Sequence, residues 1–150
     1  MYWKPLTKFL LISFVIAINV SIIWNIKNTL KWVFGRTWPL TWINNNPSLI
    51  KNHVFGFHFF HGGIGYSSFP SGHATVLATV ITTLWVFYPK WRWLYIIIGL
   101  AVIFSLLALD YHFVSDIIAG FTLGVITGLY ANCFIMKAIS KNPLSSLLSR

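Results

Sequence analysis

The chain has 150 residues, of which 57% are hydrophobic and 9% are charged, and its formal net charge at pH 7 is +9. This composition excludes an ordinary soluble domain and predicts an integral membrane protein. The only acidic residues, Asp110 and Asp116, argue against a mechanism that needs several carboxylates around Mg²⁺ or Ca²⁺. The eleven Lys and Arg are spread among the ends of apolar runs, which indicates membrane topology and not nucleic-acid binding.

Four apolar runs follow in chain order, at about 9–24, 74–88, 93–109 and 117–136. A membrane-spanning helix needs roughly 20 residues, so the first three runs reach that length only with polar flanking residues. No small-residue cleavage site follows Trp24, so we interpret the first run as a retained helix and not as a signal peptide. The sequence therefore predicts an all-α membrane bundle of about four transmembrane helices, in a single domain.

The basic residues orient these helices, because cytoplasmic segments carry the excess of Lys and Arg. The long first connection has four of them, and the short third connection has none. The other seven lie at the two ends of the chain and in the second connection: Lys4, Lys8, Lys90, Arg92, Lys137, Lys141 and Arg150. We therefore expect the first and third connections to lie together on the non-cytoplasmic side.

The first connection, at about 25–70, is long and rich in aromatic residues, Gly, Asn and His. Such long segments tend to be functional, and the rings are suited to an interfacial belt on the bilayer. His53, His58 and His61 have a spacing that suits a metal, but they have no nearby carboxylate or Cys partner. The single cysteine, Cys133, lies in an apolar run and is no ligand candidate for them. We therefore interpret the three histidines as loop or interface residues and predict no metal site.

The most specific local pattern is Pro-Ser-Gly-His at Pro70 to His73, directly before the second apolar run. Proline presets a first helical turn, and glycine lets the backbone approach a ligand closely. The free amides of Ser71 and Gly72 at such a helix start would bind an anion. His73 would then be placed to transfer a proton at a bound phosphate. Taken alone, the motif favours an ordinary capped helix that carries an interfacial histidine.

A second polar cluster, with His112 and Asp116, separates the third and fourth apolar runs. If the fourth helix begins here, the two side chains lie one turn apart on one face. Asp116 would then accept the Nδ1 proton and leave Nε2 free to attack. Ionisable residues within a membrane protein are candidates for function, whereas the competing interpretation is a random interfacial pair.

A third cluster, just past the first apolar run, contains Lys31 and Arg36. The planar guanidinium of Arg36 suits phosphate oxygens, although either cation alone is also typical of contacts with lipid headgroups. Together the three clusters resemble the type 2 phosphatidic acid phosphatase superfamily, which includes undecaprenyl pyrophosphate phosphatases, lipid A phosphatases and vanadium haloperoxidases. The resemblance covers about residues 12–128 and includes the complete second signature at Pro70 to His73.

The first and third signatures of the family are matched in part. The family has Lys, six residues and Arg-Pro, whereas here Trp38 occupies the Arg position and Arg36 lies two positions earlier. The family also has Ser-Arg, five residues, His, three residues and Asp. Ser105, His112 and Asp116 match this third signature, and Leu106 replaces its Arg. The missing cations argue against pyrophosphate substrates, although Arg36 and the two backbone amides offer compensation.

The resemblance implies that His112 attacks phosphorus to form a phosphohistidine, that Asp116 holds its ring, and that His73 protonates the leaving lipid oxygen. The phosphoryl charge would be stabilised by Lys31, Arg36 and the amides of Ser71 and Gly72. No metal or cofactor is implied. The substrate would be a phospholipid, polyprenyl or lipid A type phosphate, hydrolysed in a bacterial inner membrane at its non-cytoplasmic face.

Two further points follow from the comparison with the family pattern. Bacterial membrane members commonly have six spans, and the two that precede the Lys signature have no counterpart in residues 1–150. We therefore expect either a compact member built on the four catalytic helices or a fragment of a longer product, and the initial Met with its basic flank favours the former. The missing arginines and spans also suggest an alternative function, a catalytically silent relative that binds lipid or serves as a membrane partner. We favour the enzyme, because a silent relative has no physical need to retain His73, His112 and Asp116.

Overall fold

The computed structural model describes residues 5–42 and 44–140. In this part the chain forms α1 (Pro5–Phe34), α2 (Leu49–Asn52), η1 (Ile64–Tyr66), α3 (Gly72–Phe87), η2 (Pro89–Trp91), α4 (Arg92–Ala108) and α5 (Val114–Ser140). Three segments are long and apolar enough to cross a membrane, Leu6–Phe34, Pro89–Ala108 and Val114–Ala138, and α3 is a shorter apolar helix. The predicted all-α membrane bundle is confirmed.

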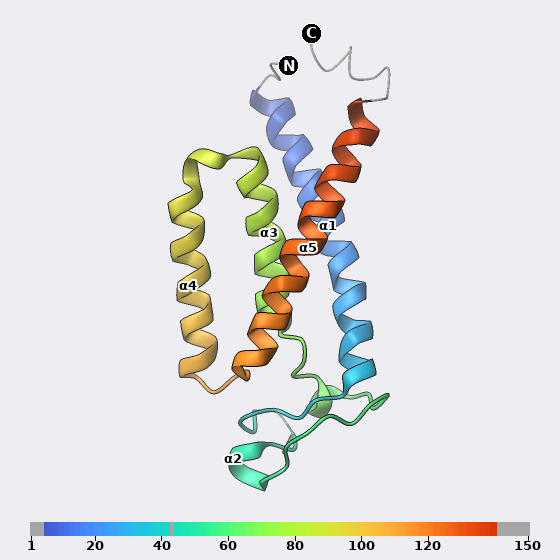
Figure 1. Ribbon diagram of the computed structural model, residues 1–150, viewed down its shortest axis with the longest axis vertical. Coiled ribbons are helices and arrows are strands. Elements are labelled where there is room, and N and C mark those ends of the chain that lie inside the picture. The colour runs from blue at the N-terminus through green and yellow to red at the C-terminus, as the bar shows by residue number, and fades with distance from the viewer. Residues whose placement is uncertain (1–4, 43, 141–150) are drawn as a thin grey trace.

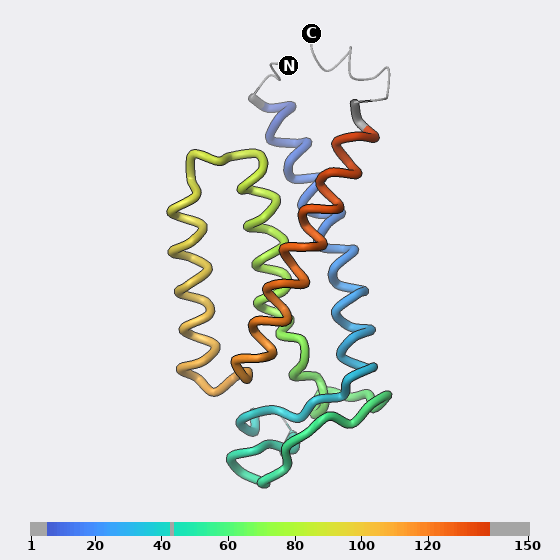
Figure 2. The backbone as a smooth tube through the Cα atoms, viewed as in Figure 1, coloured from blue at the N-terminus to red at the C-terminus, as the bar shows by residue number. Residues whose placement is uncertain are grey.

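The helices α1, α3 and α5 form the body of the bundle, and α4 returns alongside α3 as an outer helix (Figure 1). The start of α1, the turn between α3 and α4, and the end of α5 lie at one end of the bundle. The long connection after α1 and the turn between α4 and α5 lie at the other end, as the backbone trace shows (Figure 2). The three sequence motifs, which lie in these connections and in the adjoining helix ends, therefore meet at the same end.

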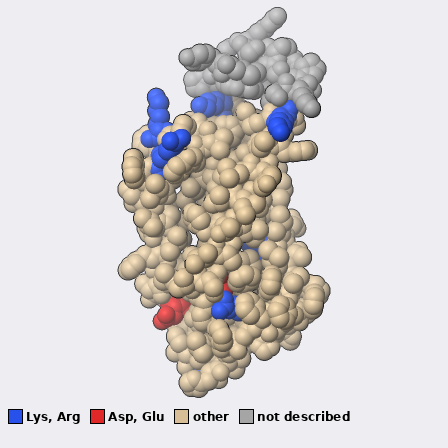
Figure 3. Space-filling model, in the orientation of Figure 1, with Lys and Arg blue, Asp and Glu red and all other residues tan. Residues whose placement is uncertain are grey.

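Basic side chains gather at the end where α1 begins and α5 ends, and a smaller basic patch lies beside acidic atoms at the opposite end (Figure 3). Lys8 and Arg92 belong to the first group, and each lies over an aromatic ring, that of Tyr88 and that of Trp85 respectively. This distribution agrees with the charge pattern used to orient the helices. Three of the charges in that pattern, Lys4, Lys141 and Arg150, lie outside the described residues.

The first helix is longer than the sequence pattern predicted. The apolar run ends near Trp24, but α1 continues to Phe34, because no Pro or Gly interrupts it before Gly35. Gly35 ends the helix with a φ of +50°, and a Cβ there would lie 1.9 Å from the carbonyl oxygen of His58. Lys27 and Lys31, which the pattern placed in the loop, are thus helical residues one turn apart.

Close packing of α3 on α5 brings two motifs together. A Cβ on Gly120 would lie 2.5 Å from the carbonyl oxygen of Ser71, and a Cβ on Gly124 would lie 2.3 Å from that of Thr75. Small residues allow such close approach between helices in a membrane. At the end of this contact the backbone N–H of Ser71 donates to the carbonyl oxygen of Asp116, at 3.0 Å. The start of α3 is therefore fixed against the first turn of α5.

Candidate active site

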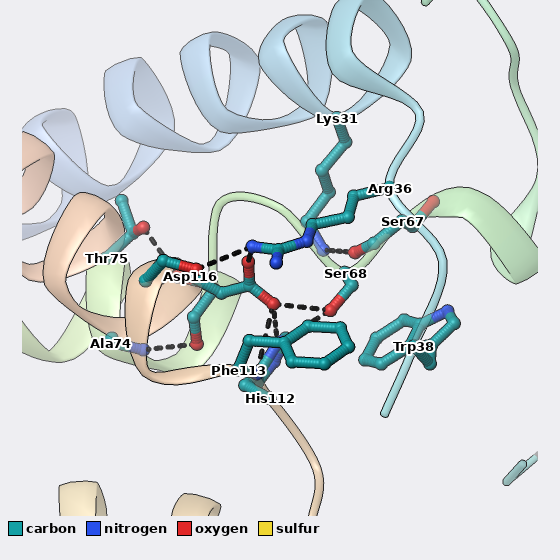
Figure 4. A network of polar contacts seen from close by, with 12 residues as sticks. Lys31, Arg36, Trp38, Ser67, Ser68, Ala74, Thr75, His112, Phe113 and Asp116 are labelled. Atoms are coloured by element: carbon teal, nitrogen blue, oxygen red, sulfur yellow. Dashed lines mark hydrogen bonds and ion pairs between the residues drawn. The ribbon is translucent and has the colours of Figure 1, made fainter. Parts of the chain in front are cut away.

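The buried carboxylate of Asp116 lies at the centre of a polar network (Figure 4). Its Oδ1 accepts a hydrogen bond from Arg36 Nη1 at 2.5 Å. Its Oδ2 accepts one from Ser68 Oγ at 2.6 Å and another from the backbone N–H of Phe113 at 3.2 Å. A buried carboxylate is costly unless it is paired and hydrogen-bonded, and here both oxygens are satisfied.

His112 precedes α5, which begins at Val114, so the predicted placement of His112 and Asp116 on one helical face is wrong. The two side chains are nevertheless neighbours, with 3.7 Å between His112 Nδ1 and Asp116 Oδ2. That distance exceeds a hydrogen bond. Ser68 lies between them, because its Oγ is 3.4 Å from Nδ1 and donates to Oδ2. Ser68 therefore connects the histidine to the carboxylate and leaves Nε2 on the opposite edge of the ring.

The environment of His112 favours a neutral imidazole. Burial of the ring lowers its pKa below the ordinary value. The Asp116 carboxylate opposes this shift, whereas the positive charges of Lys31 and His73 add to it. A neutral imidazole is the form that a nucleophilic histidine requires, and burial favours that form here.

His112 also lines a cavity of about 710 Å³. One part of the wall is polar and carries His73, His112, Gly72 and two lysines, Lys27 and Lys31. The rest of the wall is formed by Trp24, Trp38, Ile64, Ser67, Val76, Leu77, Val80, Val102 and Tyr111. No acidic side chain belongs to this lining. The cavity therefore combines two histidines and a positive region with an apolar surface suited to a lipid chain.

The two lysines reach the cavity by crossing the first turn of α3. A Cβ on Gly72 would lie 3.7 Å from Lys31 Cε and 3.8 Å from Lys27 Cδ and Cε. The Lys31 ammonium donates to the carbonyl oxygen of Ser67 and lies 5.7 Å from the ring centroid of Trp38. Two cations thus lie beside a helix start, which itself favours anions.

The predicted site residues fall into two groups. His73, His112, Lys31 and Gly72 line the cavity, with 6.3 Å between the ring centroids of the two histidines. Ser71 does not line the cavity. Its N–H donates to the carbonyl oxygen of Asp116, and its Oγ accepts a hydrogen bond from the N–H of Ala74.

Arg36 and Asp116 lie behind the cavity wall. The Arg36 guanidinium is enclosed by three rings, at 4.3 Å from Phe113, 4.9 Å from Phe57 and 5.4 Å from Phe55. It donates to Ser115 Oγ at 2.7 Å as well as to Asp116. Arg36 is therefore aimed at the carboxylate and is absent from the lining of the cavity.

Three further residues belong to the site that the sequence argument did not assign: Ser68, Trp38 and Lys27. Trp38 stands where the family pattern has Arg, and its ring lies against His112, with 5.1 Å between centroids. Its indole N–H donates to the carbonyl oxygen of Ile64 at 2.8 Å. Lys27 is four residues before Lys31, a spacing that places both on one face of a helix. This spacing was the one available signal for Lys27.

The loop histidines lie apart from the described network. His58 and His61 contact Tyr66, with ring centroids at 5.0 Å and 4.2 Å. Among residues 5–42 and 44–140, no three His, Cys, Asp or Glu side chains are grouped in a way that would hold a metal ion.

Comparison with known proteins identifies the family. The model of the PAP2 superfamily matches residues 8–140. The chain is 31% identical over 136 residues to undecaprenyl-diphosphatase of Sulfolobus acidocaldarius, which covers 81% of this chain and 58% of that protein. It is 28% identical over 102 residues to lipid A 1-phosphatase of Rhizobium etli, which covers 63% of this chain and 44% of that protein.

The chain thus spans about half the length of the curated relatives that it matches, with 58% of one protein and 44% of the other covered. No solved structure shows a significant match. The match of the family model runs through all three motifs and the four long helices. The chain therefore belongs to the PAP2 superfamily.

Proposed function

We propose that this protein is a membrane phosphatase that hydrolyses a lipid phosphate through a phosphohistidine on His112, without a metal ion. The observation that carries the proposal is the position of His112 between two environments. Its Nδ1 faces Ser68 and Asp116, and its ring lines a cavity that also holds His73 and Lys31. The apolar part of the cavity offers room for the chain of a lipid.

The chemistry follows from this placement. His112 Nε2 attacks phosphorus, the bond between phosphorus and the leaving oxygen breaks, and His73 gives that oxygen a proton. Water then attacks the phosphohistidine, with His73 as the base, and phosphate is released. Lys31 and the helix start at Gly72 stabilise the charge on the transferring phosphoryl group, which is usually the dominant contribution to such reactions.

Arg36 has a different role in this proposal from the phosphate contact expected from the sequence. Its guanidinium is committed to Asp116 and Ser115 and is enclosed by aromatic rings. We therefore assign it as a positioning residue, which holds Asp116 and, through Ser68, the ring of His112. The Ser71 amide likewise holds α3 against α5, since its hydrogen bond is made to the backbone of Asp116.

Phosphate release tests the activity. The purified chain, in lipid nanodiscs with EDTA, is given phosphatidate, a prenyl diphosphate and lipid A, and inorganic phosphate is measured. We expect turnover of at least one of these lipids and its loss in His112→Ala. The matched control is His58→Ala, because His58 is exposed and outside the cavity.

A covalent trap tests the mechanism. Lipid substrate labelled with ³²P in its phosphate should leave an acid-labile, base-stable label on the wild type and none on His112→Ala. Wild type without turnover on any of the three lipids would instead support the silent lipid-binding relative. Turnover without a label, or full activity in His112→Ala, would eliminate the phosphohistidine.

The orientation in the membrane is a further part of the proposal. Basic residues at the end with the start of α1 and the turn before α4 favour a cytoplasmic location for that end, and hence a bacterial inner-membrane site facing away from the cytoplasm. In a Cys133→Ser background, Lys51→Cys should react with an impermeant maleimide added to intact cells, and Lys90→Cys should not. Equal labelling of both, or the reverse pattern, rejects this orientation.

A further inference from the structure

Lys27 is a buried cation in the wall of the cavity, and the proposed mechanism gives this lysine no role. Only 5% of the residue is exposed, and its side chain reaches the cavity across Gly72. The ammonium donates to Asn28 Oδ1 at 2.8 Å and lies 3.6 Å from the ring centroid of Trp24. Both partners are neutral. Lys27 is thus held in place by its surroundings, and none of these contacts supplies a compensating negative charge.

The charge balance of the site shows what Lys27 lacks. Within residues 5–42 and 44–140, the ion pairs at 4.0 Å or less all involve Asp116, which is bonded to Arg36 behind the cavity. The cavity itself has two lysines and no acidic residue in its lining. Unpaired charge in a membrane protein is expensive, so a ligand with at least two negative charges would stabilise this arrangement.

The depth of Lys27 indicates which part of the ligand it meets. The first helix runs towards the site end of the bundle (Figure 1), so the Cα atom of Lys27 lies one turn, about 6 Å, deeper than that of Lys31. The Lys31 ammonium donates to the carbonyl oxygen of Ser67 and lies beside Trp38, near the end of the cavity where His112 would react. Lys27 lies against Trp24, which belongs to the apolar wall. A group beside Lys27 therefore lies between the reacting phosphoryl group and the lipid chain.

We propose that Lys27 forms a second phosphate subsite, which binds the phosphate that stays on the lipid, so that the preferred substrate is a lipid diphosphate. This inference rests on the proposed function. His112 Nε2 bonds to the terminal phosphorus, the P–O–P bond breaks, and its electron pair remains on the bridging oxygen. That oxygen becomes part of a lipid monophosphate, whose developing negative charge Lys27 neutralises. The missing arginines argued against diphosphates, and Lys27 replaces part of the lost charge.

The test compares two substrates with one chain. Farnesyl diphosphate and farnesyl monophosphate are given to the wild type, Lys27→Met and Lys27→Arg, each as the full chain in nanodiscs. Methionine keeps the length and packing of the side chain and removes its charge. We expect Lys27→Met to lower kcat/KM for the diphosphate by about tenfold or more and to change that for the monophosphate by less than about twofold, whereas Lys27→Arg restores most of the difference.

A binding measurement separates this subsite from an effect on folding. Inorganic pyrophosphate should inhibit the wild type more strongly than inorganic phosphate, and Lys27→Met should lose that difference. Lys51→Met is the matched control, because Lys51 is an exposed lysine of α2 and does not line the cavity. Equal loss on both substrates, or no loss on either, overturns the subsite while leaving phosphatase activity intact. Absence of any wild-type turnover overturns the proposed function and this inference together.

Discussion

Arg36 Nη1 lies 2.5 Å from Asp116 Oδ1, and both side chains are buried. The contact joins the segment that follows α1 to the first turn of α5, across 80 positions of sequence. It turns the carboxylate so that its second oxygen meets Ser68, the residue that reaches His112. In the proposed mechanism Arg36 therefore acts on the nucleophile through two intervening side chains, and not by contact with phosphate.

Replacement of Arg36 by lysine tests this positioning role. Lysine keeps the charge but cannot bond Asp116 and Ser115 with one planar group. We expect kcat to fall by about 10- to 100-fold, and the inhibition constant of inorganic phosphate to stay within about twofold. Steady-state kinetics with added phosphate measures both quantities.

A strong rise in the inhibition constant with little change in kcat would instead show that Arg36 contacts the phosphate. Arg36→Met provides the comparison for folding, because removing one partner of a buried ion pair typically costs about 3–5 kcal/mol. Arg36→Lys should retain more thermal stability than Arg36→Met.

Ser68→Ala should separate His112 from Asp116. The change removes the hydroxyl that donates to Asp116 Oδ2 at 2.6 Å and lies 3.4 Å from His112 Nδ1. We expect kcat to fall by about tenfold, together with a stability loss of about 1–3 kcal/mol for the lost hydrogen bond to the buried carboxylate. Activity assays and thermal unfolding of the same sample give the two values.

The neighbouring serine gives a control for that experiment. Ser67 Oγ donates to the Gly63 carbonyl oxygen in an exposed part of the loop, and Lys31 uses only the Ser67 backbone. Although Ser67 lines the cavity, its hydroxyl contacts neither Asp116 nor His112, so Ser67→Ala should keep most of the activity. Equal losses in both variants would mean that the loop as a whole, and not the Ser68 hydroxyl, supports the site.

The sequence predicted those features that local patterns determine. Apolar runs gave the helices, and Pro70 to His73 marked the start of α3 because turn chemistry is encoded locally. The end of α1 was wrong because the estimate followed hydropathy, whereas the helix stops only at Gly35. This error placed Lys27 in a loop and obscured its position beside Lys31.

The contacts of Arg36 and Ser68 were beyond the reach of the sequence argument. Both residues meet Asp116 through the path of the long connection, which no periodic pattern specifies. The predicted arrangement of His112 and Asp116 was correct only in part. Their neighbouring positions followed from the spacing, but α5 begins at Val114, so His112 lies outside the helix and Ser68 lies between the two side chains.

The acid limb of the activity profile should report on His112. Because burial lowers the pKa of its imidazole, the neutral and reactive form persists to more acidic pH than for a free histidine. The groups that face it are Asp116, which opposes the shift, and Lys31 and His73, which add to it. We expect kcat/KM to fall on acidification with a midpoint below the ordinary value of about 6.5.

Lys31→Met tests the direction of the pKa shift of His112. Loss of a nearby positive charge removes one cause of the lowered pKa of His112, so the acid limb should move to higher pH. Measuring kcat/KM from pH 4.5 to 8 in both proteins tests the sign. A midpoint above 6.5 in the wild type, or a move to lower pH in Lys31→Met, would contradict the described surroundings of His112.

Gly124→Ala should weaken the contact that brings the motifs together. The new Cβ would lie 2.3 Å from the carbonyl oxygen of Thr75 and 2.8 Å from Ala78 Cβ, so α3 and α5 must move apart. Overpacking of this kind costs about 1–3 kcal/mol, and we expect a lower Tm together with lower activity, because Ser71 and Asp116 separate with the helices. Gly99→Ala is the control, since its Cβ would meet only Ile81 Cδ1 at an ordinary 3.6 Å. Thermal unfolding and phosphate release of the two variants should therefore differ, and an unchanged Gly124→Ala protein would mean that this close approach is dispensable for the site.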